Sequence, residues 1–224
     1  MDPTSQLVIA TAVFLATHFV PSTPLRAALV KSAGERAYLG LYTLVAFATL
    51  GWMIYAYVRA PTEALWPGLR LVPAVAMPFA FIFVVGGLLQ KNPTAVGQAR
   101  FLAQEDPARG MLRVTRHPMM WGFMLWAGAH VLARGDLKSL VFFGGFLLLA
   151  ALGTRLIDAR RALEAGEAWT RFRALTSNIP FVAIAQGRNR FDPGEIGLVK
   201  IAFGLILYGG FLLAHGWLFG AQPW

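Results

Sequence analysis

Long apolar stretches alternate along the chain with shorter polar and basic segments. A helix needs about 20 apolar residues to cross a bilayer core of roughly 30 Å, and the longer stretches come close to this length. The pattern predicts six transmembrane helices, at residues 6–20, 37–58, 72–89, 118–132, 139–157 and 196–219. We therefore expect an all-α fold, a polytopic membrane helix bundle in which residues 1–224 form a single transmembrane domain.

A charged segment with helical periodicity follows the fifth predicted span. Its apolar residues recur at about the spacing of helix turns among arginines and glutamates. They are Leu163, Trp169, Phe172 and Leu175. This spacing predicts a cytoplasmic amphipathic helix at residues 159–176. Such a helix can lie on the membrane surface or pack on the cytoplasmic ends of the bundle, and the pattern leaves both arrangements open.

The composition supports the membrane assignment. Hydrophobic residues make up 57% of the chain and charged residues only 14%, which is outside the balance of ordinary soluble domains. The net charge of +9 would favour a nucleic-acid partner in a soluble protein, but the basic residues gather in the loops after the first, third and fifth predicted spans. By the positive-inside rule these loops lie in the cytoplasm and both termini lie outside. We expect the lipid bilayer as a partner, and no nucleic acid.

The sequence contains no cysteine, and this excludes several kinds of chemistry. Disulfides, iron–sulfur clusters, thiolate nucleophiles and haem attached through a Cys-x-x-Cys-His motif all require this residue. A haem in this protein would therefore be held non-covalently.

The stretch from Arg116 to His130 carries the strongest candidate chemistry. Pro118 fits the first position of a helix, where its missing N–H is not needed, so His117 lies at the boundary of the fourth span and His130 inside it. An ionisable residue within a membrane span is a functional candidate by default. His117 and His130 lie about 20 Å apart along a helix and point to roughly opposite sides, so they cannot bind one metal ion from the same side.

His18, in the first predicted span, is a second intramembrane candidate. Because the first and fourth spans run in opposite directions, we expect His18 and His130 at depths that differ by roughly 15 Å. A haem between the two imidazoles is compatible with this spacing if the helices tilt or the span ends shift. The alternative, histidines that only hydrogen-bond a neighbouring helix, stays open. His215 lies nearer the outer boundary, and its spacing assigns it no role.

Several short motifs follow one another in a specific order over nearly the whole chain. They are Thr17-His18, Gly34-Glu35-Arg36-Ala37-Tyr38, Arg116-His117-Pro118, Trp126-Ala127-Gly128-Ala129-His130, Gly135-Asp136-Leu137 and Ser177-Asn178-Ile179-Pro180-Phe181. In this order they resemble the NnrU family of integral membrane proteins, to which the 15-cis-zeta-carotene isomerases are related. The resemblance implies a helix bundle in the bacterial inner membrane.

The resemblance also implies a haem b cofactor. Carried over from the isomerase, its axial metal ligands correspond to His18 and His130, and His117 is expected near the pocket. Arg116 or Arg113 is then expected to pair with the haem propionates at the cytoplasmic boundary, because arginine binds carboxylates bidentately.

The activity implied by the resemblance is a redox or nitric-oxide-related role, or the cis–trans isomerisation of a polyene of the zeta-carotene type. The implied small-molecule partner is a hydrophobic polyene or a quinone-like molecule. The isomerase has a cysteine three residues before its second haem ligand, where this chain has Ala127. A thiolate ligand switch is therefore excluded.

A second resemblance supports an alternative function. Arg116-His117-Pro118, a helical hairpin and then Asp158 are similar in order to the isoprenylcysteine carboxyl methyltransferase group, which binds S-adenosylmethionine at the cytoplasmic ends of its last helices. The paired glutamates of that group are replaced here by Asp158-Ala159, so the likeness extends to a shared helical plan more than to a shared reaction. A non-catalytic membrane subunit is a third alternative. The substrate, the redox partner and the oligomeric state stay open.

Overall fold

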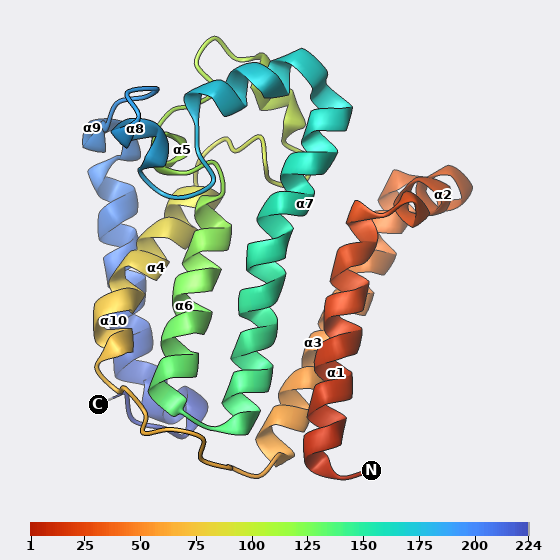
Figure 1. Ribbon diagram of the computed structural model, residues 1–224, viewed down its shortest axis with the longest axis vertical. Coiled ribbons are helices and arrows are strands. Elements are labelled where there is room, and N and C mark those ends of the chain that lie inside the picture. Colours follow the sequence, from red (N-terminus) through yellow and green to blue (C-terminus); the bar gives the residue numbers. More distant parts are fainter. Residues whose placement is uncertain (224) are drawn as a thin grey trace.

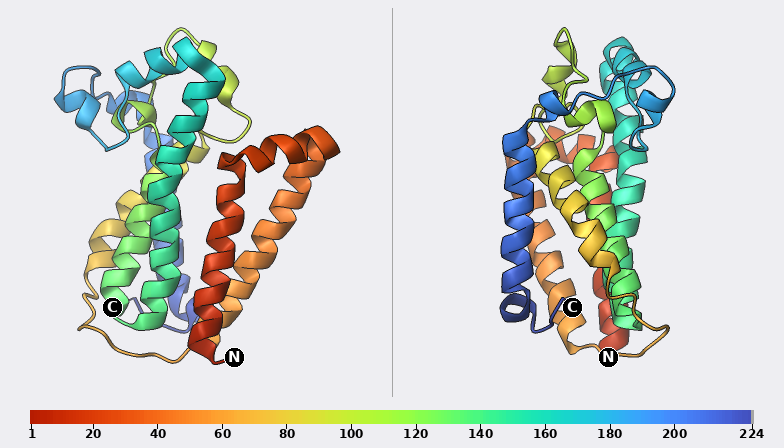
Figure 2. Two further views of the ribbon diagram at one scale, coloured as in Figure 1. Left: turned by 45° about the vertical axis from the view of Figure 1, so that its right-hand side comes forward. Right: turned by 90° about the vertical axis from the view of Figure 1, so that its left-hand side faces the viewer.

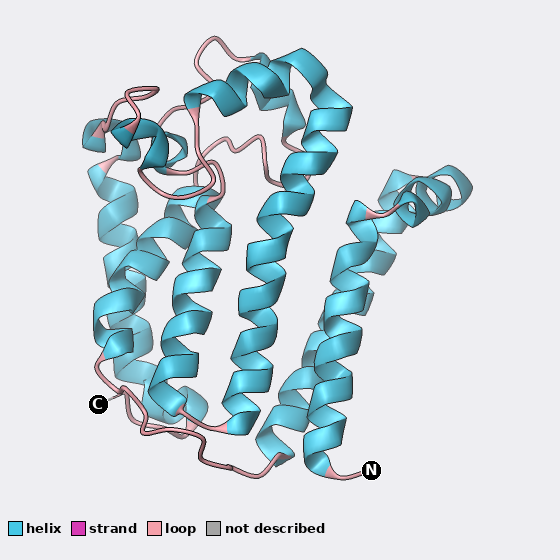
Figure 3. Cartoon of the chain, in the orientation of Figure 1, coloured by secondary structure: helices cyan, strands magenta, loops and turns pink. Residues whose placement is uncertain are grey.

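The computed structural model describes residues 1–223, which fold mainly into helices joined by loops (Figure 1, Figure 3). The long helices are α1 (Pro3–Phe19), α3 (Glu35–Arg59), α4 (Val72–Leu88), α6 (Pro118–Arg134), α7 (Leu137–Leu175) and α10 (Leu198–Phe219). The short helical elements are η1 (Val20–Ser22), α2 (Pro24–Ala33), η2 (Ala99–Ala103), α5 (Met111–Val114), α8 (Val182–Ala185) and α9 (Pro193–Ile196). The prediction of an all-α bundle is confirmed. Trp224, the last residue of the predicted domain, lies outside the described residues.

Within residues 1–223, four helices are long and apolar enough to cross a membrane: α1 together with η1, α3, α7 and α10. α4 is a shorter apolar helix, and α6 has 17 residues. The six long helices coincide with the six predicted spans to within a few residues, apart from the long extension of α7. Six membrane crossings are not confirmed, because length and hydropathy support four.

The bundle has two distinct ends (Figure 1). Both chain ends lie at one of them, which we call the terminal end. The loops at residues 20–34, 89–117 and 176–197 lie at the opposite end, which we call the basic end because the basic loops of the sequence are there. Neighbouring helices pack in the order α3, α1, α7, α6, α4, α10 (Figure 2). The side of the membrane on which each end lies stays a prediction.

Glycines allow α4 to approach its neighbours closely. A Cβ atom on Gly122 of α6 would lie 2.8 Å from the carbonyl oxygen of Ala80 in α4. A Cβ atom on Gly204 of α10 would lie 3.1 Å from the Cα atom of Ile82, on the same helix α4. Small residues of this kind let membrane helices pack backbone to backbone.

The turn between α6 and α7 is determined by two adjacent residues. Gly135 ends α6 in the left-handed conformation, with φ 63°. Asp136 then caps α7, because its side chain accepts a hydrogen bond of 2.8 Å from the backbone N–H of Ser139. The tight turn that the sequence predicts at this point is confirmed.

Helix α7 continues well beyond the predicted end of the fifth span at residue 157. It bends at Gly166, where φ is 49° and ψ is −117°. Beyond the bend, Trp169 and Phe172 are buried against Leu102 and Leu112. Part of the apolar face of the predicted amphipathic helix therefore packs on the end of the bundle, whereas Leu163 is 90% exposed.

Candidate functional site

Arg116 and His117 meet Asp158 of α7 at the basic end. His117 Nε2 lies 2.7 Å from Asp158 Oδ1, and the Arg116 guanidinium pairs with the same carboxylate through Nε, at 3.0 Å, and through Nη2. His117 is 1% exposed and Arg116 is 7% exposed. This cluster joins the start of α6 to the middle of α7, two sites that lie far apart in the sequence.

Burial lowers the pKa of His117, so we assign its imidazole as neutral, with the proton on Nε2 donated to Asp158. The Nδ1 atom of His117 is buried and has no hydrogen-bond partner among the described residues. The carboxylate of Asp158 is thus occupied by a guanidinium and an imidazole. Removing it would leave a charged arginine buried without its partner.

The two arginines that were expected to bind cofactor carboxylates already have protein partners. Arg116 pairs with Asp158. Arg113 pairs with Glu195 at 2.7 Å and with Asp106 at 2.7 Å. Neither guanidinium is held free for a propionate in this arrangement.

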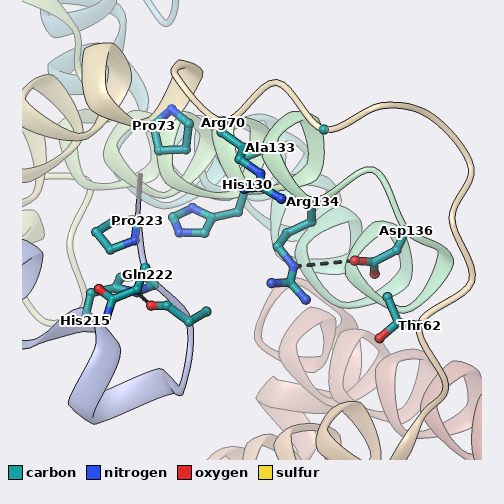
Figure 4. Close-up of a pocket in the computed structure, with 12 residues that line it drawn as sticks. Thr62, Arg70, Pro73, His130, Ala133, Arg134, Asp136, His215, Gln222 and Pro223 are labelled. Carbon is teal, nitrogen blue, oxygen red and sulfur yellow. Dashed lines mark hydrogen bonds and ion pairs between the residues drawn. The ribbon is translucent and has the colours of Figure 1, made fainter.

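A cavity of about 490 Å³ lies at the terminal end, between the ends of α6 and α10 (Figure 4). His130 and His215 both line it, together with Arg70, Arg134 and Asp136. The His130 imidazole points towards the C-terminal segment that follows α10 (Figure 4). The sequence predicts both histidines on the outer side of the membrane, and this shared side is the sequence signal for their proximity. The spacing of the spans did not pair them.

Each of the three histidines in the long helices bonds a backbone carbonyl through Nδ1. The distances are 2.7 Å from His18 to Phe14, 2.8 Å from His130 to Trp126 and 2.7 Å from His215 to Ala221. In a neutral imidazole this geometry places the proton on Nδ1, so that Nε2 is the acceptor. An imidazole oriented in this way can bind a metal ion or accept a proton through Nε2.

The structure does not bring His18 and His130 together. The rings of Phe14 and Trp126 both contact Phe146 of α7, each with a centroid separation of 5.2 Å. His18 follows Phe14 by one turn towards the basic end, and His130 follows Trp126 by one turn towards the terminal end. The two imidazoles therefore do not contact each other, because the rings of Phe14, Phe146 and Trp126 lie between them.

This separation bears on the predicted haem. Two axial ligands have to approach one iron atom from opposite faces of the macrocycle. Between His18 and His130, the rings of Phe14, Phe146 and Trp126 form a continuous series of contacts. In this packing, aromatic rings lie between the two histidines. Their pairing on one haem b stays a prediction.

Comparison with known proteins gives the family and two relatives. The NnrU protein family matches residues 6–223. The chain is 28% identical over 170 residues to the chloroplastic 15-cis-zeta-carotene isomerase of Arabidopsis thaliana, covering 70% of this chain and 44% of the relative. It is 35% identical over 81 residues to the enzyme of the same name from Zea mays, covering 36% of this chain and 22% of the relative.

The chain thus spans less than half the length of the curated relatives it matches. No solved structure matches it. The family match extends over all six long helices of the bundle. This chain belongs to the NnrU protein family.

Proposed function

We propose that this protein is a membrane-embedded isomerase that converts a cis double bond of an apolar polyene, of the zeta-carotene type, to trans. The observation that carries the proposal is the similarity to the Arabidopsis thaliana 15-cis-zeta-carotene isomerase over 70% of this chain. The apolar helices support it further, because a polyene dissolves in the bilayer core and reaches such a protein from the lipid.

We propose the cavity beside His130 and His215 as the reaction site. Cis–trans isomerisation adds and removes no atoms, so the site has to weaken one double bond during rotation and then restore it. An imidazole nitrogen can take an allylic proton from the polyene, which delocalises the double bond, and return the proton to the same carbon after rotation. His130 and His215 line the same cavity, and the hydrogen bonds of their Nδ1 atoms leave Nε2 of the neutral rings as the acceptor.

The direct test is conversion of 15-cis-zeta-carotene by the full chain in lipid nanodiscs, with products separated by liquid chromatography. We expect the trans product, and a rate about 100-fold lower for His130→Ala, which is the scale of losing one acid–base group. Leu213→Ala is the matched control, because Leu213 lies in α10 near His215 and is 83% exposed. Equal rates for His130→Ala and the wild type would reject the site, and no conversion at all would reject the function.

Haem b is tested separately, by absorption spectra of the purified protein in the oxidised and reduced states. His18, His130 and His215 each have a free Nε2 atom, so each is compatible with binding as a single ligand. Absence of a Soret band after haem supplementation would exclude haem b as a cofactor. It would also exclude the redox or nitric-oxide-related role that was predicted together with haem.

The methyltransferase alternative has less support. In the isoprenylcysteine carboxyl methyltransferase group, a pair of glutamates follows the helical hairpin. Here the acidic residue after the hairpin is Asp158, and its carboxylate is already paired with Arg116 and His117. Titration calorimetry with S-adenosylmethionine decides between the two enzymes. Binding of this cofactor without polyene conversion would favour the methyltransferase. If the protein neither binds the cofactor nor converts the polyene, the non-catalytic subunit is favoured.

A further inference from the structure

A second cavity, of about 380 Å³, lies at the basic end and is not used by the proposed function. It is a shallow, open depression, lined by the last turn of α7, the following loop and α8. Three of its lining residues are arginines: Arg116, Arg173 and Arg188. We call it the arginine pocket.

Two of these guanidinium groups are not neutralised by carboxylates. Arg116 pairs with Asp158. Arg173 and Arg188 form no ion pair of 4.0 Å or less with any carboxylate of residues 1–223. The arginine pocket therefore carries an uncompensated positive charge, which favours an anionic ligand.

Arg188 is held in position by the backbone of the segment that lines the pocket. Its Nη1 atom donates to the carbonyl oxygens of Ala174 at 2.7 Å and Thr176 at 2.9 Å. Its Nε atom donates to the side chain of Gln186 at 2.9 Å. A guanidinium ordered in this way loses little conformational freedom when it binds an anion.

Exposed apolar residues lie in the segments that line the arginine pocket or close to them in sequence, and we call them the apolar rim. Ile179 is 59% exposed, Phe181 is 49% exposed and the neighbouring Phe191 is 53% exposed. The rings of Phe181 and Phe191 contact each other edge to face, with centroids 5.9 Å apart. Aromatic and arginine side chains that lie together at the end of a membrane bundle are typical of the boundary between headgroups and acyl chains.

Phe181 occupies a backbone conformation that a bulky residue rarely adopts. Its φ angle is +65°, and no other non-glycine residue of the described chain has a positive φ. The backbone N–H of Phe181 donates to the carbonyl of Val114 at 2.8 Å, and its carbonyl accepts from Ala185 at 2.8 Å. These bonds hold the backbone of Phe181 in this conformation in spite of its unfavourable φ angle, and the residue stays 49% exposed.

We propose that the arginine pocket binds the phosphate group of an anionic phospholipid. Arg173 and Arg188 pair with the phosphate, and Ile179, Phe181 and Phe191 contact the glycerol and upper acyl region of the same lipid. A free phosphate ion would use the same guanidinium groups but would make no use of the apolar rim. The proposal is independent of the isomerase activity.

The experiment is native mass spectrometry of the detergent-solubilised full chain, titrated with phosphatidylglycerol or with phosphatidylcholine. We expect one phosphatidylglycerol retained more strongly than phosphatidylcholine, and about tenfold weaker retention for Arg173→Gln, the scale of one charge-assisted contact. Arg171→Gln is the matched control, because Arg171 is an exposed arginine two residues away that does not line the pocket.

Phe181→Gly separates a lipid from a free ion. Glycine accepts the positive φ without strain, so this variant keeps the fold. We expect this variant to retain phosphatidylglycerol more weakly and to bind inorganic phosphate as the wild type does. Equal retention of the two lipids, or equal effects of Arg173→Gln and Arg171→Gln, would overturn the proposal. Inorganic phosphate that binds as tightly as phosphatidylglycerol would overturn the lipid assignment.

Discussion

Asp158 determines how the strongest sequence motif is used. A buried guanidinium is stable only when a carboxylate and further hydrogen-bond acceptors replace its water shell. For Arg116 the carboxylate comes from Asp158, which also accepts from His117. At the scale of single residues, the Arg116-His117 pair is therefore a link between two helices. The histidines with free Nε2 atoms are the half-buried ones of the long helices.

Asp158→Asn is expected to destabilise the protein by about 3 kcal/mol, because it leaves Arg116 buried with a neutral partner. The measurement is thermal unfolding in detergent, followed by circular dichroism. Glu35→Gln serves as the control, since the side chains of Glu35 and its partner Arg26 are 64% and 28% exposed and solvent screens their ion pair. If Asp158→Asn and the control unfold at the same temperature, the buried pair has no structural role.

A second prediction at this scale concerns pH. Hydrogen bonds from Arg113 lower the pKa of Glu195 to about 2, whereas an unfolded glutamate titrates near 4.5. The folded state then holds fewer protons than the unfolded state, so this stabilisation is present above about pH 4.5 and is lost as the pH falls towards 2. Unfolding temperatures measured from pH 6 downwards should fall more steeply for the wild type than for Glu195→Gln. Parallel curves would contradict the assignment, and Glu35→Gln, in an exposed pair with Arg26, is the control.

At the scale of elements, the α6–α7 hairpin is the best defined unit. Gly135 ends one helix and Asp136 begins the next, so the two helices turn back on each other within two residues. The loop after α3 packs on this turn, because the N–H groups of Leu65 and Trp66 both donate to the carbonyl oxygen of Gly135. The hairpin thereby positions His130, one turn before its end, beside the cavity at the terminal end.

Gly135→Ala should lower the free energy of unfolding by more than the strain of a positive φ angle alone. The new Cβ atom would lie 2.2 Å from the carbonyl oxygen of Trp66, so the loop after α3 would have to move. Gly187→Ala is matched, because Gly187 has a φ of +69° but nothing within 4 Å of the added atom. We expect Gly187→Ala to lower the free energy of unfolding by about 1 kcal/mol and Gly135→Ala to lower it by at least twice as much, both measured by thermal unfolding. Equal losses would mean that the loop contact does not constrain the turn.

At the scale of the whole molecule, charge and topology agree. The long helices place both chain ends at one end of the bundle and the basic loops at the other (Figure 1). Neutral helices cross a bilayer in either direction, so the positive loops decide which end stays in the cytoplasm. The arginine pocket lies at the same basic end, where anionic headgroups of the inner leaflet would meet it.

The orientation can be tested because the chain has no cysteine of its own. Ser5→Cys places a thiol at the terminal end, and Ser32→Cys places one at the basic end, both at exposed positions. In intact bacterial cells, a membrane-impermeant maleimide should label the first variant and should label the second only after permeabilisation. Labelling in the reverse order would invert the predicted topology.

The sequence by itself determined the helices of this protein, because hydropathy and turn chemistry act between near neighbours. The second long helix, predicted at residues 37–58, is observed at Glu35–Arg59, and the turn at Gly135 lies where its residue type requires. The tertiary structure alone decided which side chains meet. It paired Asp158 with Arg116, brought His215 to the cavity of His130 and separated His18 from it. These contacts depend on the rotation and depth of helices distant in sequence, which packing sets and no local pattern encodes.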